Sequence, residues 1–392
     1  MFVFPEPDKG FNMYTTLAGE FHKNGHEVYV LAPDNRHRKT EIRSENNINV
    51  LRVRTFPVKN VPNFIKGISN LLLPFQYNRA IMKHYPSAIF DLIITSTPPI
   101  TLVDLAAKLK RKHNNMIYLI LRDIFPQNAV DLGFIKRGSF IYRYFREKEK
   151  KLYKTADHIG CMSEGNINYL LSQNDYLNKN KLHLLPNFQK LNDSFPVKDL
   201  SILTKYGLQD KYVVIFGGNM GKPQQLENVI ALAKTCQEYP DVIFLLLGEG
   251  VQKLRIEEMY KAEGIKNIVI IDTISKDEYQ KLVGVCDIGL ISLHADFTIP
   301  NIPSKTLDYF NMGIPVLASI DHSTDYWKLL DEAETGLWSY AGDLKSFKAN
   351  FDKLYHTPDL RKQMGINARR YFESHLTPEK AYASIIGKLK EN

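Results

Sequence analysis

The sequence predicts an α/β protein built from two doubly wound, Rossmann-like domains. Short apolar runs alternate with helical patterns along the chain, and both halves show the same alternation. Continuous apolar strands are typical of parallel sheets that helices cover on both faces. The length of 392 residues also suits two domains of ordinary size.

In the first half, residues 14–24 predict a helix that Gly25 ends. Further strands are expected at residues 26–31, 91–96, 116–121 and 158–162. In the second half, strands are expected at residues 212–216, 242–247, 268–271, 288–292 and 315–318.

A cluster of Asn, Asp, Ser and Pro over residues 186–201 marks the boundary between the halves. We therefore expect a first domain over residues 1–190 and a second over residues 191–375. Residues 376–392 contain an amphipathic helical pattern, and we expect this helix to pack back towards the first domain.

The composition is that of a globular protein, with 44% hydrophobic and 24% charged residues. No apolar run reaches the roughly 18 residues of a membrane-spanning helix, and residues 1–10 lack the pattern of a signal peptide. Cys161, Cys236 and Cys286 are too widely spaced for a disulfide framework or a metal site. We therefore expect a cytoplasmic protein.

The charge is unevenly placed, since residues 1–200 hold 29 Lys and Arg against 18 Asp and Glu, and the remainder hold 22 against 25. A basic first half suits a nucleic acid, a phosphorylated substrate or an anionic membrane surface. Residues 64–85 mix aromatic, leucine and basic side chains, and residues 136–154 add further Lys and Arg. These segments are either a membrane-binding surface or ordinary helices with solvated basic faces.

Residues 216–225 (FGGNMGKPQQ) follow a predicted strand and are expected to open a helix. Gly217, Gly218 and Asn219 would let the backbone N–H groups approach a phosphate closely. Lys222 would add a positive charge for a diphosphate. The alternative is a tight strand-to-helix turn with a solvated lysine.

Residues 302–315 (IPSKTLDYFNMGIP) predict a short helix that Ser304 caps and Gly313 ends. Lys305 in the first turn opposes the helix dipole, a conflict that a bound anion would relieve. Asp308, one turn beyond Ser304, could reach a sugar hydroxyl. The alternative is a capped surface helix with a lysine there by chance.

Arg122 and Asp123 directly follow a predicted strand, so they hold substrate or form a structural ion pair. No GxSxG, HExxH or Asp-x-Asp motif occurs, which favours a mechanism without metal and without a cofactor other than the donor substrate.

Blocks at residues 16–32, 122–137, 217–230 and 303–318 together resemble GT-B-fold, family-4-type retaining glycosyltransferases. The chain is most similar to the bacterial subgroup that builds capsular and O-antigen polysaccharides, including amino-sugar transferases. The resemblance implies two domains that face a central cleft. The second would hold a nucleotide-diphosphate sugar, UDP-linked and N-acetylated, and the first a lipid-linked or saccharide acceptor. The strand at residues 1–4 is short for the family, as a truncated start would make it.

The resemblance also implies roles for single residues. The diphosphate would lie between Gly218, Asn219 and Lys222 on one side and Ser304 and Lys305 on the other. Asp308 would bind the ribose, Gly217 would belong to the donor loop, and the backbone at Thr273 and Ile274 would bind the base. Gly10, Phe11 and Arg122 would lie at the acceptor, and Asp123 would orient or activate its hydroxyl.

Two departures from the family pattern matter. Pro300 stands where the family's E-x7-E motif has its first acid, and Asn219 and Gln224 replace the usual Arg and Lys of the phosphate loop. Lys222 and Lys305 would therefore act as the catalytic cations, stabilising the leaving phosphate in a same-face substitution.

Three other functions compete with this interpretation. A sugar-nucleotide 2-epimerase would share the fold and the donor site but need no acceptor. A two-domain binding protein would bind a ligand without catalysing a reaction. A nucleic-acid binder would fit the charge, but the sequence contains no recognised module for it, so no nucleic-acid partner is expected. For the transferase, we expect peripheral association with the anionic inner face of the cell membrane.

Overall fold

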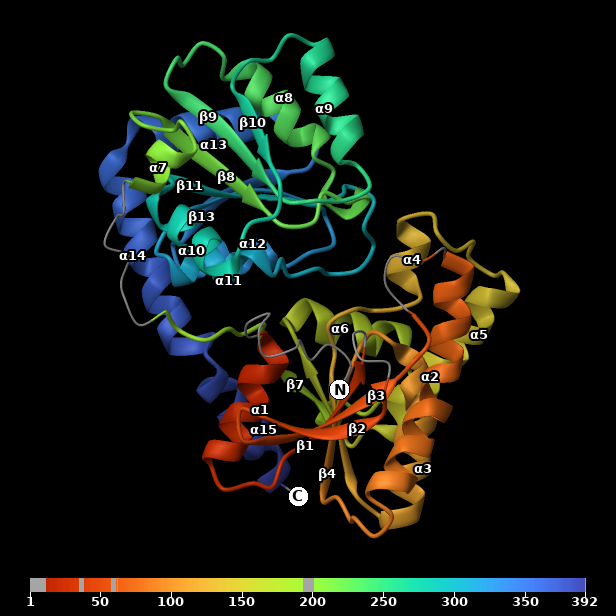
Figure 1. Ribbon diagram of the computed structural model, residues 1–392. Helices are drawn as coiled ribbons and strands as arrows, with labels where there is room; N and C mark the ends of the chain where they lie inside the picture. The colour runs from red at the N-terminus through yellow and green to blue at the C-terminus, as the bar shows by residue number, and fades with distance from the viewer. Residues whose placement is uncertain (1–11, 35–38, 58–60, 62, 193–200, 392) are drawn as a thin grey trace. The chain divides into compact units, whose positions relative to one another are not determined.

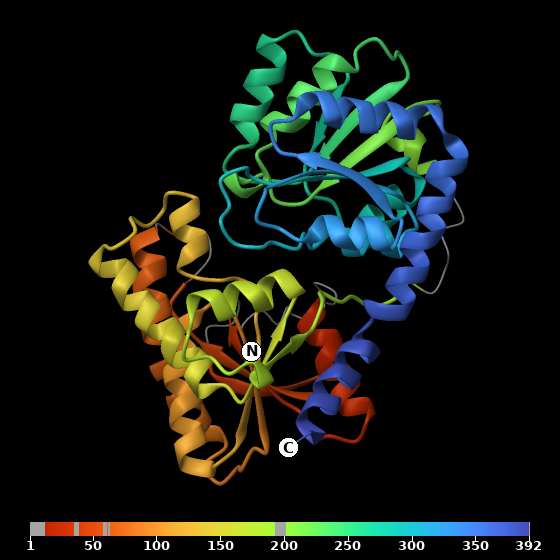
Figure 2. The ribbon, with the colours of Figure 1, turned by 180° about the vertical axis from the view of Figure 1, so that it is seen from behind.

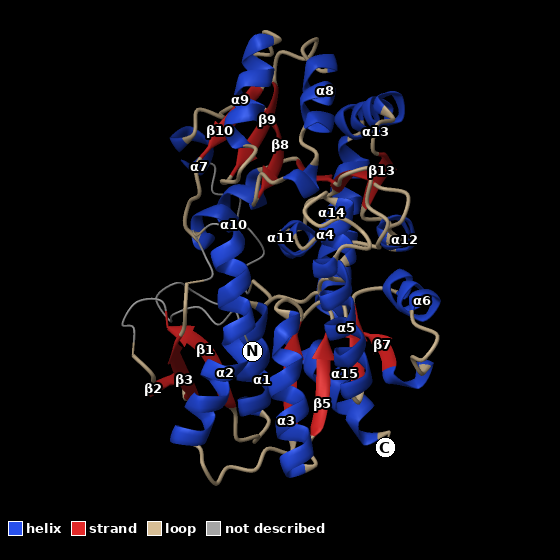
Figure 3. Ribbon diagram, turned by 90° about the vertical axis from the view of Figure 1, so that its right-hand side faces the viewer, coloured by secondary structure: helices blue, strands red, loops and turns tan. Residues whose placement is uncertain are grey.

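The computed structural model describes residues 12–34, 39–57, 61, 63–192 and 201–391 (Figure 1). The chain divides into two compact units, here called the N-terminal unit (Met1–Lys190 with Pro378–Asn392) and the C-terminal unit (Leu191–Thr377). Both contain parallel sheets flanked by helices (Figure 3), which confirms the predicted α/β class.

The described residues of the N-terminal unit form two sheets, with strand orders β1-β3-β2 and β4-β5-β6-β7. Their strands are β1 (Tyr29–Asp34), β2 (Glu41–Glu45), β3 (Ile48–Arg54), β4 (Leu92–Ser96), β5 (Met116–Ile120), β6 (His158–Cys161) and β7 (Leu182–Leu184). All pairs are parallel except β2 with β3. The sequence predicted β4, β5 and β6 to within one residue at each end, whereas β1 begins three residues later than expected.

Helices flank both sheets of this unit. They are α1 (Met13–Lys23), α2 (Asn63–His84), η2 (Ile100–Leu102), α3 (Val103–His113), α4 (Gln127–Asp131), α5 (Phe140–Thr155), α6 (Glu164–Gln173), η3 (Lys179–Lys181) and α15 (Pro378–Lys390). Helix α15 packs against α1 (Figure 2), so the last helix of the chain completes the N-terminal unit.

The hairpin of β2 and β3 was not predicted. Glu45 pairs with Ile48, so a two-residue turn joins the strands. Asn46 and Asn47 both adopt left-handed φ angles, 52° and 62°, as tight hairpin turns require. The Asn-Asn pair was the available sequence signal.

The C-terminal unit contains one six-stranded parallel sheet of order β10-β9-β8-β11-β12-β13. The strands are β8 (Tyr212–Gly217), β9 (Val242–Leu247), β10 (Ile268–Ile271), β11 (Ile288–Ser292), β12 (Val316–Ile320) and β13 (Gly336–Tyr340). The five predicted strands all form, and β13 adds a sixth. Its run GLWSY is too short and polar to stand out as a buried strand.

Helices cover both faces of this sheet, and the strand side chains alternate between two cores. Val213 and Ile215 face one core, and Val214 and Phe216 face the other, so β8 is apolar throughout. The helical elements are α7 (Ser201–Lys205), η4 (Lys222–Gln224), α8 (Glu227–Thr235), α9 (Lys253–Ala262), α10 (Lys276–Val285), α11 (Lys305–Asn311), α12 (Tyr326–Glu332), α13 (Leu344–His356) and α14 (Pro358–His375). No helix in the described part of the chain combines the length and apolar character needed to cross a membrane.

Candidate functional site

The loop after β8 crosses the loop after β9 at the carboxyl ends of these strands. The N–H of Gly218 donates to the Leu247 carbonyl oxygen over 2.9 Å, and the N–H of Met220 donates to that of Glu249 over 2.7 Å. Gly218 and Gly248 have φ angles of +121° and +137°. A Cβ atom at Gly248 would lie 2.1 Å from the Gly218 oxygen, so the crossing requires glycine. Gly248 was not predicted to take part in this crossing.

Residues 218–221, here called the glycine loop, are followed by only one helical turn. Residues Lys222–Gln224 form the 3-10 turn η4, with Pro223 near its start, and α8 begins only at Glu227. Gln225 between them adopts a left-handed φ of 38° and interrupts the helix. The sequence predicted one helix after this loop, whereas the structure has the turn η4 and then the separate helix α8.

Lys305 of α11 brings the two predicted phosphate-binding segments together. Its Nζ donates to Oε1 of Gln224 over 2.6 Å and lies 4.6 Å from the ring centre of Phe216. A Cβ atom at Gly218 would lie 3.3 Å from Cε of Lys305, so the end of this side chain lies over the glycine loop. Burial lowers the pKa of Lys305 to about 8, although the Asp308 charge acts in the opposite direction.

The prediction that Ser304 caps α11 is wrong. Ser304 occupies the N-cap position, but with φ −67° and ψ −21° its side chain makes no capping hydrogen bond. A capping side chain normally needs an extended backbone at this position. The Ser304 side chain is instead exposed, while Asp308 on the same helix is partly buried.

Gly217 is buried, and the close packing of Tyr279 against it explains why this position needs a glycine. A Cβ atom there would lie 2.1 Å from the Tyr279 hydroxyl oxygen. The Gly217 N–H donates to the Tyr309 hydroxyl over 3.3 Å, and this hydroxyl lies 3.1 Å from the carbonyl oxygens of Ile215 and Leu290. Sequence reasoning missed both tyrosines. Gly289 could have indicated a buried ring nearby, because a glycine inside a strand marks a close approach of another group. A Cβ atom at Gly289 would lie 2.3 Å from the Tyr309 ring.

Lys222 lines a cavity of about 330 Å³ beside the glycine loop. Arg255 and His294 line the same cavity, and Arg255 forms an ion pair with Glu227 over 2.8 Å. Asn219 is exposed on the loop itself. Thr273 and Ile274 follow β10, where Thr273 is exposed and Ile274 packs against the core.

In the N-terminal unit, Arg122 and Asp123 follow β5. Their N–H groups both donate to Oγ1 of Thr97, which follows β4, over 3.1 and 3.2 Å. The Arg122 Nη1 donates to the Leu185 carbonyl oxygen over 3.1 Å, whereas its Nε and Nη2 are buried without a hydrogen-bond partner. These two described side chains form no salt bridge within 4 Å, although the charge of each acts on the pKa of the other.

Burial shifts the pKa of both charged groups. It raises the pKa of Asp123, which the Arg122 charge partly offsets, and it lowers that of Arg122. A carboxyl group with a raised pKa and no hydrogen bond to the described residues is suited to accepting a proton. Gly10 and Phe11, predicted to lie at the same site, are outside the described residues.

Two family models match the chain. The model of glycosyl transferases group 1 matches residues 202–371, and that of glycosyltransferase family 4 matches residues 12–191. The chain belongs to the GT-B glycosyltransferases of the family-4 type, as the sequence resemblance predicted.

Relatives and solved structures agree with this family. A probable glycosyltransferase of Pseudomonas aeruginosa, WbjE, is 23% identical over 63% of this chain and 61% of its own length. A putative colanic acid biosynthesis glycosyl transferase of Escherichia coli, WcaI, is 27% identical over 31% of this chain and 30% of its own. The matches thus span less than two thirds of either relative.

Two solved structures share the fold over nearly the whole chain. The lipopolysaccharide biosynthesis glycosyltransferase WaaG has a TM-score of 0.69 at 16% identity, covering 98% of both chains. Anabaena HepE in complex with UDP has a TM-score of 0.71 at 12% identity, covering 100% of this chain and 98% of its own. The chain therefore has a GT-B fold and is related to enzymes of bacterial polysaccharide biosynthesis.

Proposed function

We propose that the protein transfers an N-acetylated amino sugar from a UDP-linked donor to a lipid-linked saccharide acceptor in surface polysaccharide biosynthesis. The donor binds the C-terminal unit and the acceptor binds the N-terminal unit. The observation that carries the proposal is the Lys305 ammonium group, held over Gly218 by Gln224. A partly buried cation beside a glycine loop is suited to binding a diphosphate.

The donor reacts by breaking the bond between the anomeric carbon and the phosphate oxygen. Negative charge then grows on the leaving diphosphate, where Lys305, Lys222 and the N–H group of Asn219 stabilise it. The Gly217 and Gly218 N–H groups take no part, because they already donate to the Tyr309 hydroxyl and the Leu247 carbonyl oxygen. Asp308 binds the ribose, Ser304 binds the diphosphate and the backbone at Thr273 and Ile274 binds the base. The complex of HepE with UDP supports UDP as the nucleotide.

The acceptor hydroxyl forms the new bond to the anomeric carbon on the face that the phosphate leaves. Asp123 orients this hydroxyl, and its proton passes to the leaving phosphate or to Asp123. Arg122 positions the acceptor with Gly10 and Phe11. The raised pKa of Asp123 supports this role, because a carboxylate in a buried site accepts a proton more readily. The reaction as proposed uses no metal and no further cofactor.

Exposed apolar side chains on α2 and α5 support association with an anionic membrane. Phe75 of α2 is 73% exposed and Phe140 of α5 is 85% exposed, and both helices pack against η2. Further exposed apolar residues on these helices are Ile68, Leu71, Leu72, Met82, Ile141 and Tyr144. Basic residues on α5 would lie near the lipid headgroups. Such a surface would place the enzyme at the inner face of the cell membrane, beside its acceptor.

The test is calorimetric titration of UDP, GDP and UDP-N-acetylhexosamines into the wild-type protein and the variant Lys305→Gln. We expect micromolar binding of UDP and its sugars, and at least about tenfold weaker binding by the variant. Absence of nucleotide binding to folded wild-type protein would favour a plain binding module. Conversion of a UDP-sugar to its 2-epimer without acceptor would favour the epimerase instead.

A further inference from the structure

Strands β8 and β11 lie side by side in the sheet of the C-terminal unit and separate towards their carboxyl ends (Figure 1). In the order β10-β9-β8-β11-β12-β13, the strands that follow β8 along the chain lie on one side, and those that follow β11 lie on the other. Within the described chain, β8 pairs with β9 over its whole length but with β11 only at Val214 and Ile215. Ligands of open parallel sheets bind where the strand order reverses in this way, outside the carboxyl ends of the strands.

The hydroxyl group of Tyr309 lies between β8 and β11 where their pairing stops. Its oxygen is 3.1 Å from the carbonyl oxygens of Ile215 on β8 and Leu290 on β11. It also accepts a hydrogen bond from the Gly217 N–H over 3.3 Å. Tyr309 is fully buried, and its ring packs on β11 at Gly289. One side-chain hydroxyl therefore takes the place of the backbone hydrogen bonds that would otherwise continue between the two strands.

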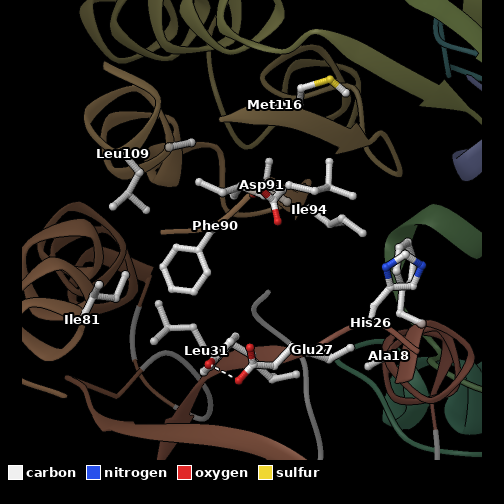
Figure 4. A pocket seen from close by; sticks show the side chains of 18 of the residues that line it. Ala18, His26, Glu27, Leu31, Ile81, Phe90, Asp91, Ile94, Leu109 and Met116 are labelled. Atoms are coloured by element: carbon white, nitrogen blue, oxygen red, sulfur yellow. Dashed lines mark hydrogen bonds between the residues drawn. The ribbon is translucent and has the colours of Figure 1, made fainter. Parts of the chain in front are cut away.

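Strand separation in the N-terminal unit has a different character. Between β1 and β4, the described residues surround a cavity of about 570 Å³ with a mainly apolar lining, and Figure 4 shows Leu31 on one side of it and Ile94 across from it. In the C-terminal unit, a polar group fills the separation, and β8 and β11 remain in one sheet. The Tyr309 contact thus belongs to the unit in which the donor site is proposed.

Helix α11 links Tyr309 to the phosphate-binding lysine. Tyr309 and Lys305 are one helical turn apart, so their side chains extend from the same face of α11. The Tyr309 hydroxyl contacts Gly217, the last residue of β8, while the end of Lys305 lies over Gly218, the next residue. The two contacts together fix where the glycine loop begins relative to Lys305. Asn219, whose N–H group would meet the diphosphate, follows directly in the chain.

We propose that the Tyr309 hydroxyl is a positioning group for the donor site, because it holds β8 and β11 at the separation that aligns the Asn219 N–H with Lys305. The inference rests on the proposed function of this site in binding a diphosphate. Without the hydroxyl, the buried Gly217 N–H loses this partner, and an unpaired buried donor favours a rearrangement that pairs it again. The end of β8 then moves, and the Asn219 N–H moves with it relative to Lys305.

The test compares Tyr309→Phe with the matched variant Tyr326→Phe. Tyr326 is also fully buried, and its hydroxyl also forms a hydrogen bond at α11, to Oγ1 of Thr306 over 2.7 Å. Both variants should lose stability towards urea, but only Tyr309→Phe should bind UDP at least about tenfold more weakly in calorimetry. Amide hydrogen exchange of peptides that cover residues 212–221 should be faster only in Tyr309→Phe.

The pH dependence of UDP binding separates positioning from a general loss of packing. Burial lowers the pKa of Lys305 to about 8, while the Asp308 charge acts in the opposite direction. When the glycine loop moves away from Lys305, its ammonium group becomes less buried and its pKa rises towards the ordinary lysine range. The loss of UDP affinity between pH 7 and pH 9 should therefore become smaller in Tyr309→Phe and stay as in the wild type in Tyr326→Phe.

Gly289→Ala gives a second variant, because it keeps the hydroxyl while its Cβ atom would lie 2.3 Å from the Tyr309 ring and displace it. It should reproduce the weaker UDP binding and the faster exchange. Equal affinity and exchange in Tyr309→Phe and the wild type would overturn the positioning role alone, and so would equal losses of affinity in Tyr309→Phe and Tyr326→Phe. Failure of the folded wild-type protein to bind any nucleotide would overturn the proposed function and, with it, this role of Tyr309.

Discussion

Lys305 of α11 donates a hydrogen bond from Nζ to Oε1 of Gln224, 2.6 Å away in the turn after β8. This contact joins two segments whose contacting residues are 81 positions apart in the sequence. Gln224 is neutral, so it holds the ammonium group without neutralising it. The positive charge remains available to a bound anion.

The pKa of Lys305, lowered by burial to about 8, predicts a pH-dependent donor affinity. Above this pH the free protein loses the Lys305 charge, whereas a bound diphosphate favours the charged form. Binding of UDP should therefore weaken about tenfold between pH 7 and pH 9, accompanied by proton uptake. Calorimetry in buffers of different ionisation enthalpy measures both effects.

Lys305→Gln is the control for this pH dependence. It should bind UDP weakly at every pH, because it has no charge to lose. Lys305→Arg should bind with nearly constant affinity, since the guanidinium group remains charged. A pH dependence that persists in Lys305→Gln would contradict the assignment to Lys305.

Gln224→Glu should weaken donor binding although it preserves the size of the side chain. The new carboxylate would pair with Lys305, raise the pKa of the ammonium group and repel the diphosphate. We expect at least about tenfold weaker UDP binding at pH 7, measured by calorimetry. Gln363→Glu on the exposed surface of α14 is the matched control and should bind as the wild type.

Asp123→Asn should reduce turnover and leave donor affinity unchanged. Loss of a positioned proton acceptor typically costs about 10²–10⁴-fold in rate. The raised pKa of Asp123 also predicts that the acidic limb of the kcat profile lies above the ordinary carboxyl range and disappears in the variant. Asp104→Asn, a carboxylate paired with Lys148 and Lys151, is the control. Equal turnover by Asp123→Asn and wild type would exclude the proposed role.

Replacing the exposed phenylalanines of α2 and α5 should release the protein from membranes. In flotation assays, the double variant Phe75→Ser and Phe140→Ser should lose binding to vesicles that contain anionic lipid. UDP binding should remain. Val251→Ser, at a position 89% exposed in the C-terminal unit, controls for general loss of apolar surface. Flotation of the double variant at the wild-type level would exclude this surface.

The sequence predicted most of the C-terminal unit, because its strands are apolar on both faces and glycines mark the loops that follow them. It could not predict that Lys305 contacts Gln224, since that contact depends on how α11 packs against the sheet. Tyr309 and Tyr279 were missed for the same reason. In the N-terminal unit, β1 was placed too early. It pairs with β3 only from Tyr29 and continues to Asp34, whereas Pro33 and Asp34 are residues typical of a turn.

Asp321, which follows β12, should make the C-terminal unit less stable as the pH rises. Burial raises its pKa to about 6, while the Ser323 and Thr324 N–H groups only partly oppose the shift, and its Oδ2 is buried without a partner. The folded state therefore binds a proton that the unfolded state releases near pH 4. Stability from this group is present below about pH 4 and is lost as the pH rises through about 6.

Asp321→Asn should remove this cost, since its side-chain oxygen can still accept from both N–H groups. The variant should match the wild type near pH 4 and be more stable at pH 8 by up to about 3 kcal/mol. Urea unfolding followed by tryptophan fluorescence measures the effect, because both tryptophans, Trp327 and Trp338, lie in the C-terminal unit. Asp343→Asn is the control of opposite sign, since hydrogen bonds to Ser346 lower the pKa of that carboxyl group. A stability difference for Asp321→Asn that does not change with pH would show that the carboxyl group is not the cause.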